Sequence, residues 1–552
     1  FYKGIHHLIL NHCKLSLYMD YLLVLCTTFN IIYNKLRRLL MYKIQKISTL
    51  VSIAILSSTF SGVAMSNTMG GVVNVAIIGE ADTLDPMKST KDVVGTVTQH
   101  IYETLFTFDS SWAPAPLLAD GMPDVSGDGL TYTIKIRQGI NFHDGSSMDS
   151  ADVVDSLNRW LKVASRGKSV ASKVDSVTAL DAYTVEIKLN TVYSALLSLM
   201  SMNNAAAVIY PQENIQGEDL AAPIGTGPYK VGEYKADQYL QLVRYDGYSS
   251  SSSPVDGASG SRAAYLDEVN FIPVGDGSTR LEGLLSGQFD FAESIAAESY
   301  ARLESSSIAE PVLLAPYGWP MWVINHKKGI MTDLNVRKAL QAALPAEDML
   351  YAAFGDEKFY KADGALYPEG FIWNSDAGLE NYGTGDTDKA NAFLKASSYD
   401  GSPLRILTSK QYMWHFKTAE VAKIYLEQAG FKVQMDVVDW ATLGQRRNNP
   451  DLWDVFLSHS PYIPEPSLNG TMQATYRAGW TNGEKEYLMS KFTSVTDTAE
   501  RVAIWSQIQE NYFNDVGFIK LGSFNSLRGK SQSLKGVPET PWPFFWNADR
   551  KS

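Results

Sequence analysis

Residues 128–160 read "DGLTYTIKIRQGINFHDGSSMDSADVVDSLNRW" and predict a strand, a turn and a helix in that order. Polar and apolar residues alternate in "TYTIKIR" (131–137), which is typical of a half-buried strand. "NFHDG" (141–145) follows with the residue types that form turns. Asp149 or Ser150 can cap the next helix, whose apolar residues recur on one face.

The same alternation of strands and helices continues along much of the chain, which indicates the α/β class. A helix is expected at 418–430, ending at Gly430, a favoured C-terminal stop. A polar, Ser/Gly-rich stretch, "YSSSSSPVDGASGSR" (248–262), predicts a surface loop that buries nothing. Residues 72–86 are expected to begin with a buried strand and continue into a turn, and further strands are expected at 182–189 and 431–440.

The length of 552 residues is too great for one core and predicts two or three domains. Both cysteines, Cys13 and Cys26, lie in the first 66 residues. Residues 67–552 hold 41 basic and 59 acidic residues, a net charge of −18. An acidic body argues against nucleic acid and anionic membrane surfaces as partners.

The N-terminal region contains a pattern typical of a secretory signal peptide at 41–66. Lys43 and Lys46 precede an apolar stretch, and residues 64–66 fit a cleavage site. A membrane anchor is the alternative, but the apolar run is short for a bilayer. Residues 1–40 are interpreted as upstream sequence translated from a miscalled start, with an anchor at 15–33 as the alternative. No cysteine follows the apolar run, so we expect a soluble periplasmic protein.

Catalytic motifs are scarce in this chain. It has no G-x-S-x-G, H-E-x-x-H or C-x-x-C sequence, and "GTGPY" (225–229) lacks the other residues of a nucleotide loop. Residues 67–552 contain five histidines, none of which pairs with another at metal-ligand spacing: His100, His143, His326, His415 and His459. We therefore expect no metal, no cofactor and no enzymatic activity. A secreted hydrolase using His143, Asp144 and a serine stays as a distant alternative, although adjacent residues on an extended chain point to opposite sides.

Several blocks in order resemble the bacterial extracellular solute-binding proteins of family 5, the peptide, nickel and opine-binding components of ABC importers. The blocks are 128–160, "PIGTGPYKVGEY" (223–234), 265–291, "TDLNVRKALQAAL" (332–344), "WDVFL" (453–457) and 480–510. This resemblance implies a two-lobed periplasmic-binding-protein fold (class II) with an extra inserted domain. Its ligand is enclosed as the lobes close around hinge strands.

The resemblance also implies domain boundaries. Lobe I is expected at 67–105, 222–317 and 516–552, the inserted domain at 106–221, and lobe II at 318–515. The hinge candidates are "APYGWPMWVINHK" (315–327) and "GFIKLGSFNSL" (517–527). The implied partners are a small peptide or peptide-like solute and the permease subunits of an importer, with the chain acting as a monomer. A nickel or metallophore, opine or haem binder of the same family is the alternative.

The family's peptide-binding members carry Gly-Trp and then Asp after the "WDV" strand, and that Asp holds the peptide's amino terminus. Here His459, Ser460 and Ile463 occupy those three places. A buried ammonium without a carboxylate is costly, so we expect the amine to be held differently or to be absent. Glu465 or Asp454 could substitute.

Candidate ligand contacts follow from the resemblance and from residue chemistry. "SHSPY" (458–462) is the first candidate segment, and Arg446-Arg447 could present a fork to a carboxylate, although a solvated loop is the alternative. Trp319 and Trp322 could stack on a ligand or pack in the core. Tyr412, Trp414 and His415 form another aromatic cluster. The complete predicted set is Glu80, Thr83, Trp319, Trp322, Arg446, Arg447, Ser458, His459, Ser460 and Tyr462.

Overall fold

The computed structural model describes residues 69–410 and 412–550. The predictions of a signal peptide at 41–66 and of an upstream segment at 1–40 lie outside these residues. Within them, no helix is both long enough and apolar enough to cross a bilayer.

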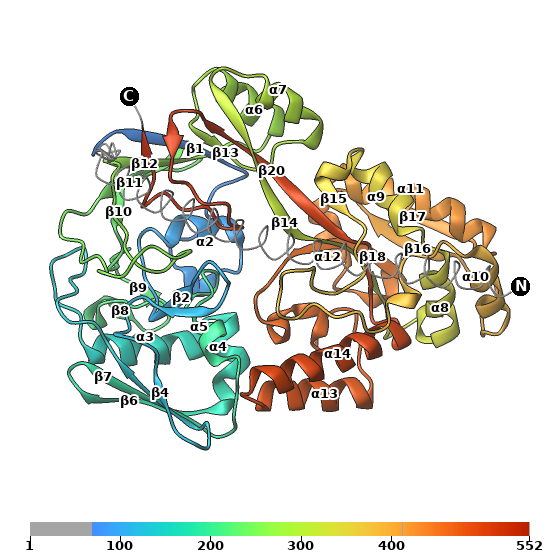
Figure 1. The fold of residues 1–552 in the computed structure, drawn as a ribbon, viewed down its shortest axis with the longest axis horizontal. Coiled ribbons are helices and arrows are strands. Elements are labelled where there is room, and N and C mark those ends of the chain that lie inside the picture. Colours follow the sequence, from blue (N-terminus) through green and yellow to red (C-terminus); the bar gives the residue numbers. More distant parts are fainter. Residues whose placement is uncertain (1–68, 411, 551–552) are drawn as a thin grey trace, which may run out of the picture. The chain divides into compact units, whose positions relative to one another are not determined.

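A large mixed sheet organises the described chain (Figure 1). Its main path, in spatial order, is β10 (Tyr229–Lys235), β11 (Tyr239–Arg244), β12 (Glu268–Pro273), β1 (Val72–Ile77), β13 (Phe291–Ala292), β20 (Ser523–Ser531), β14 (Ala309–Ile324), β18 (Val455–Pro461), β16 (Leu404–Thr408) and β17 (Val433–Val437). Two short strands lie off this path: β15 (Tyr360–Lys361) pairs with β20, and β19 (Ile519–Lys520) pairs with β14.

The two long strands β14 and β20 connect the two halves of this sheet, as Figure 1 shows. They pair antiparallel from Ala309↔Ser531 to Leu314↔Ser526, and β14 then continues against β18. We call the β1, β10–β13 side the first lobe and the β16–β18 side the second lobe. Both connecting strands overlap the segments expected to form the hinge.

A separate four-stranded sheet packs beside the first lobe. Its order is β4 (Asp124–Val125), β5 (Thr131–Lys135), β7 (Thr184–Leu189) and β6 (Val174–Asp181). The helices α3 (Ser150–Val163) and α4 (Ser165–Val170) follow β5 in the chain. Tyr132 and Ile134 are buried while Thr131 and Thr133 are half-buried, as the alternation predicts. This sheet and the first lobe share one hydrophobic core, so the insertion is not an independently packed body.

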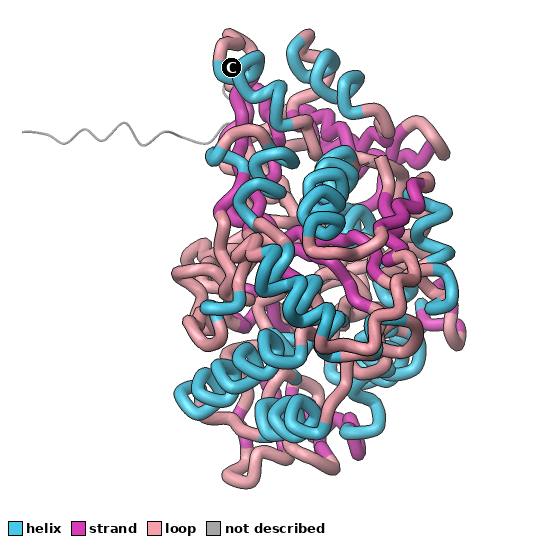
Figure 2. The backbone as a smooth tube through the Cα atoms, turned by 90° about the vertical axis from the view of Figure 1, so that its right-hand side faces the viewer, coloured by secondary structure: helices cyan, strands magenta, loops and turns pink. Residues whose placement is uncertain are grey.

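Helices surround the strands of the second lobe, and Figure 2 shows several of them over the strands on this side. Two hydrophobic cores lie in this lobe, one mainly aliphatic and one rich in tryptophan and tyrosine. The helices are α8 (Leu334–Ala343), α9 (Ala346–Phe354), α10 (Thr387–Lys395), α11 (Met413–Gln428), α12 (Trp440–Arg446), α13 (Gly483–Ser494) and α14 (Thr498–Asp515). The helices of the first lobe are α2 (Asp92–Thr98), α5 (Leu196–Met200), α6 (Gly277–Leu285) and α7 (Tyr300–Glu304).

The two lobes also touch away from the connecting strands. The backbone N–H of Ser194 donates to the carbonyl of Thr493 at 2.9 Å, in the last turn of α13. Phe108, Met202 and Trp542 form a small apolar cluster against which Ile463 packs from the second lobe. The structure therefore places groups of both lobes within contact distance of one another.

Candidate functional site

His143 and Asp144 form a structural corner. The His143 Nε2 bonds to the carbonyl of Gly227 at 2.9 Å, and its Nδ1 accepts the N–H of Gly225 at 3.3 Å. Asp144 instead accepts both the N–H and the hydroxyl of Ser146 within its own turn. Both ring nitrogens are used in joining the turn to the "GTGPY" loop, so the arrangement is not a His–Asp catalytic pair.

The helix after this corner begins as the sequence predicts. Asp149 caps α3 by accepting the N–H of Ala151, and Asp152 accepts the N–H of Asp149 in return. This reciprocal pair is a capping box, which satisfies N–H groups that a helix start leaves free.

Glu80 and Thr83 serve the first lobe locally. Glu80 accepts the hydroxyl of Tyr234 at 2.6 Å and the N–H of Asp237 at 3.2 Å, both near the β10–β11 turn. The hydroxyl of Thr83 accepts the N–H of Asp85. Both residues therefore make these hydrogen bonds within the first lobe.

Trp319 and Trp322 are buried, which fits the core alternative for these two residues, and contact with a ligand stays a prediction. They are 1% and 0% exposed, so neither presents a ring face at the surface. Trp319 packs edge-on against Tyr462 at 5.2 Å between ring centroids. Tyr462 is itself buried, with its hydroxyl 2.7 Å from that of Ser523, so it also belongs to this core.

The outer end of β18 carries a cluster of rings, which we call the histidine–aromatic group: Tyr412, Trp414, His415, Trp440 and His459. His459 is half-buried, and its ring lies 5.0 Å from Tyr412, 5.1 Å from Trp414 and 6.1 Å from Trp440 between centroids. The predicted contact His459 and the separately noted Tyr412, Trp414 and His415 thus come together in one place.

The two histidines of this group are uncharged at neutral pH. His459 Nδ1 lies 3.3 Å from His415 Nε2, within hydrogen-bond distance. Burial, aided by the nearby charge of Arg447, lowers the pKa of His459 to about 4. Burial lowers the pKa of His415 well below its usual value. In residues 69–410 and 412–550, no three His, Cys, Asp or Glu side chains gather in a way that could hold a metal ion.

One edge of β18 is open at His459. Pro320 pairs with His459 in the β14–β18 ladder. It has no N–H, and its carbonyl accepts the N–H of Leu521 on the side of β14 that faces away from β18. Alternation along the ladder therefore turns the backbone N–H and C=O of His459 away from β14. The ladder with β16 on that side ends at Phe456, so no strand of the described chain pairs with His459 there.

Charged groups of the first lobe face this region, and sequence reasoning missed them. Asp92, at the start of α2, keeps an exposed side chain and accepts the Trp542 indole N–H at 2.8 Å. Burial raises the pKa of Tyr412 in the second lobe; the charge of Asp92 adds to this rise, and the charge of Arg280, also from the first lobe, opposes it. Glu293 follows β13 directly, and burial raises its pKa while the charge of Arg528 lowers it. No sequence motif marks these residues, because only the meeting of the lobes brings them near β18.

The position of the missing amine anchor is apolar. Ile463 packs against the cluster of Phe108, Met202 and Trp542. Glu465 is engaged with Arg501 at 2.7 Å, and Asp454 makes two contacts of 3.0 Å with Arg405. Both carboxylates that could substitute for the anchor are therefore already paired.

The remaining predicted contacts differ in exposure. Ser458 is buried and Ser460 is half-buried, with its hydroxyl donating to the carbonyl of Pro461. Arg446 is exposed, whereas Arg447 is half-buried and its Nε has no hydrogen-bond partner among residues 69–410 and 412–550.

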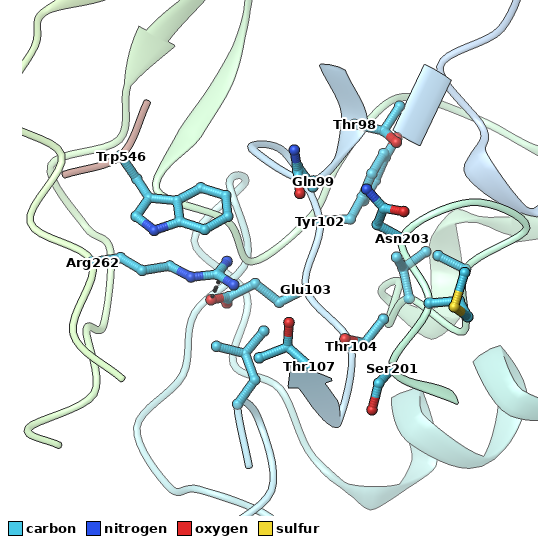
Figure 3. A pocket seen from close by; sticks show the side chains of 14 residues that line it. Thr98, Gln99, Tyr102, Glu103, Thr104, Thr107, Ser201, Asn203, Arg262 and Trp546 are labelled. Atoms are coloured by element: carbon cyan, nitrogen blue, oxygen red, sulfur yellow. Dashed lines mark hydrogen bonds and ion pairs between the residues drawn. The ribbon is translucent and has the colours of Figure 1, made fainter. Parts of the chain in front are cut away.

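A small cavity of about 30 Å³ in the first lobe contains a structural ion pair (Figure 3). Arg262 contacts Glu103 at 3.3 Å and lies over the Trp546 ring, with its Cζ 3.9 Å from the centroid. The volume has room for about one water molecule. Arg262 ends the polar stretch 248–262, so the expectation that this loop buries nothing is wrong: a partner 159 residues away neutralises its charge.

Comparison with known proteins identifies the family. Residues 113–482 match the model described as "Bacterial extracellular solute-binding proteins, family 5 Middle". The chain belongs to this family. The resemblance inferred from the ordered blocks is thereby confirmed.

Three similar proteins illustrate the range of the family. The probable peptide ABC transporter periplasmic-binding protein y4tO of Sinorhizobium fredii is 26% identical over 495 residues, which cover 84% of this chain and 91% of that protein. The glutathione-binding protein GsiB of Pectobacterium atrosepticum is 26% identical, with coverages of 85% and 92%. The oligopeptide-binding protein AppA of Bacillus subtilis, solved with a nonapeptide, has a TM-score of 0.73 at 22% identity, with coverages of 88% and 100%. The two-lobed α/β fold is thereby confirmed.

Proposed function

We propose that the chain is a periplasmic solute-binding protein, acting as a monomer. It captures a peptide or peptide-like solute between its lobes and delivers that solute, without chemical conversion, to the permease subunits of an ABC importer. The domain division at 67–105, 106–221, 222–317, 318–515 and 516–552 is part of this proposal. Family membership and the names of y4tO and GsiB support it.

The observation that carries the proposal is the open edge of β18 at His459. An extended peptide can add a strand to such an edge, because its backbone supplies the N–H and C=O groups that the edge leaves free. The rings of the histidine–aromatic group lie next to this edge and offer apolar faces to side chains.

The backbone pairing can be tested with His459→Pro, and His459→Ala is the matched control. Proline removes the outward N–H, whereas alanine keeps it; the fold loses no ladder bond in either case, because that N–H faces away from β14. Binding of a synthetic tripeptide mixture is measured by calorimetry. We expect at least a tenfold larger loss of affinity for His459→Pro than for His459→Ala. Equal losses in the two variants would contradict pairing at this edge.

A further inference from the structure

We propose that the site takes a short solute, which in the case of a peptide has two or three residues. Two features of the structure support this length: the open edge of β18 is one residue long, and the two lobes meet directly beyond it. The inference rests on the proposed function, because it specifies the length of solute that the same site accepts.

The strand β16 covers one end of this edge. β18 lies between β14 and β16 in the sheet (Figure 1). β16 pairs with β18 up to Leu407 opposite Phe456, and it ends at Thr408. In this parallel ladder Leu407 bonds to the two neighbours of Phe456, so the outward groups of Leu457 face β16. A ligand strand at His459 therefore has the end of β16 directly beside it and cannot continue along β18 in that direction.

Pro461 limits the other end of the edge. The alternation that turns His459 outward also turns Pro461 outward, two residues further along the same ladder. Proline has no N–H, and the carbonyl of Pro461 accepts the hydroxyl of Ser460 at 2.9 Å. The next residue, Tyr462, donates its N–H back to the carbonyl of Tyr317 at 3.1 Å. Along this edge of the described chain, His459 is therefore the one residue whose outward N–H and C=O can both pair with a ligand.

A single pairing residue sets the scale of the ligand. An extended ligand residue opposite His459 gains two backbone hydrogen bonds, one to each outward group. Its neighbours on either side gain none from β18, because successive residues of a strand point their backbone groups to alternate sides. Further ligand residues therefore lose conformational entropy on binding without gaining ladder bonds.

The lobes touch where a longer ligand would continue past the open edge. Ile463 of the second lobe packs against the small apolar cluster on the first-lobe side, whose buried members are Phe108, Met202 and Trp542. The carbonyl of Ile463 accepts the hydroxyl of Tyr367 at 2.7 Å within the second lobe. Contacts with both lobes therefore hold this segment in place, four residues after His459.

The contact between the lobes continues along the chain after Ile463. Leu468 packs against the same apolar cluster, and Tyr193, which follows β7, makes a side-chain hydrogen bond with Ser467. The Ser467 hydroxyl also donates to the Glu465 carboxylate at 2.7 Å. A ligand that extended in this direction would have to separate these contacts, and the separation would lower its affinity.

The test compares, by calorimetry, a synthetic tripeptide mixture with a hexapeptide mixture of the same amino-acid composition. The wild-type chain is expected to bind the tripeptides at least tenfold more tightly. Hexapeptides that bind as tightly as the tripeptides, or more tightly, would overturn the inference and leave peptide capture intact. If neither mixture binds, the proposed function fails and this inference fails with it.

Two substitutions should let the site accept a longer ligand. Pro461→Ala supplies an N–H where the edge now ends, and Ile463→Ala removes the apolar contact between the lobes. In the double variant the preference for tripeptides should fall to about threefold or less. A loss of lobe closure alone would weaken binding of both mixtures by the same factor, so the ratio of the two affinities separates length selection from a structural effect.

Pro464→Ala is the control, because it also replaces a proline of this segment, but the Pro464 carbonyl is held within the second lobe by the Trp373 indole N–H at 2.8 Å. It should keep the wild-type ratio of affinities. Ile463→Ala alone is measured beside the double variant and should lower the preference at least threefold, so the result does not depend on the folding of one variant. A wild-type ratio in both Ile463→Ala and the double variant would overturn the inference.

Discussion

Arg262 in the first lobe is buried and paired with Glu103, whereas Arg447 in the second lobe is half-buried and forms no ion pair within the described chain. Glu103 neutralises Arg262, accepts the hydroxyls of Thr226 and Tyr248, and leaves a cavity too small for a solute. Arg447 has Arg477 beside it instead, and the helix face next to it is open. The difference separates a buried charge that is neutralised within the fold from a half-buried charge that lies beside another cation.

Removing the acid of the first pair gives the largest expected effect. Glu103→Gln leaves Arg262 buried without an opposite charge, and losing one partner of a buried pair costs about 3–5 kcal/mol. Urea unfolding measures the free energy of unfolding. Glu282→Gln is the control, because its pair with Arg302 is exposed and contributes less than about 1 kcal/mol. Similar losses in the two variants would remove the distinction between buried and exposed pairs.

The free energy of unfolding should fall at acidic pH, because the folded chain keeps some histidines neutral. The pKa of His459 is about 4 in the folded chain and about 6.5 in an unfolded one. Between these two pH values the unfolded state binds a proton at His459 and the folded state does not. Stability is therefore lost as the pH falls from about 6.5 to about 4. His459→Asn should reduce this loss by about 3 kcal/mol, measured by urea unfolding at pH 7 and pH 4.

His326 provides a comparison for the pH experiment. Burial also lowers its pKa to about 4, but it lies away from the histidine–aromatic group and bonds to the carbonyl of Gly517. Its replacement should flatten the pH dependence by a similar amount without changing tripeptide binding. A wild-type pH dependence in His459→Asn would show that His459 titrates normally in the folded chain.

The His143 corner should affect stability and not binding. His143→Ala removes one bond to Gly227 and one from Gly225, and the loss of such bonds at a largely buried site costs about 1–3 kcal/mol. Thermal unfolding measures this cost, and calorimetry with the tripeptide mixture should give an unchanged affinity. A loss of affinity at unchanged stability would place His143 in the ligand site.

The smallest expected effect is on the stability of Arg447→Gln. Because Arg447 has no carboxylate partner to lose within the described chain, the free energy of unfolding of the ligand-free variant should stay within about 1 kcal/mol of wild type, or rise. Urea unfolding of ligand-free protein measures it. A loss as large as that of Glu103→Gln would show that Arg447 has a structural partner after all.

The local pattern of polar and apolar residues was sufficient to predict many of the strands and helices. The alternation at 131–137 and the one-sided apolar face after Asp149 correspond to β5 and α3 in the structure. Burial of Trp319 and Trp322 could not be predicted, because an aromatic residue in a strand fits a core and a ligand wall equally well. Glu103 and Arg262 were missed as a pair because they are 159 residues apart in sequence.

The candidate site could be predicted only in part, because it also depends on contacts between residues that are distant in sequence. "SHSPY" was found from its place after the "WDV" strand, but which of its residues face outward depends on the ladder with β14. Arg446 and Arg447 are the same residue type, so residue type alone does not distinguish them. Their spacing does, because only Arg447 lies seven residues after Trp440 and therefore on the same helix face. Asp92 and Glu293 carry no such signal, since their role depends on how the lobes meet.

Native mass spectrometry of the chain, as purified from the compartment that carries it, tests capture of a peptide-like solute most directly. We predict a bound species of a few hundred daltons or more that fragments into amino-acid residues and is lost after unfolding and refolding. Absence of any bound molecule, together with no shift in melting temperature from either peptide mixture, would contradict the proposed function.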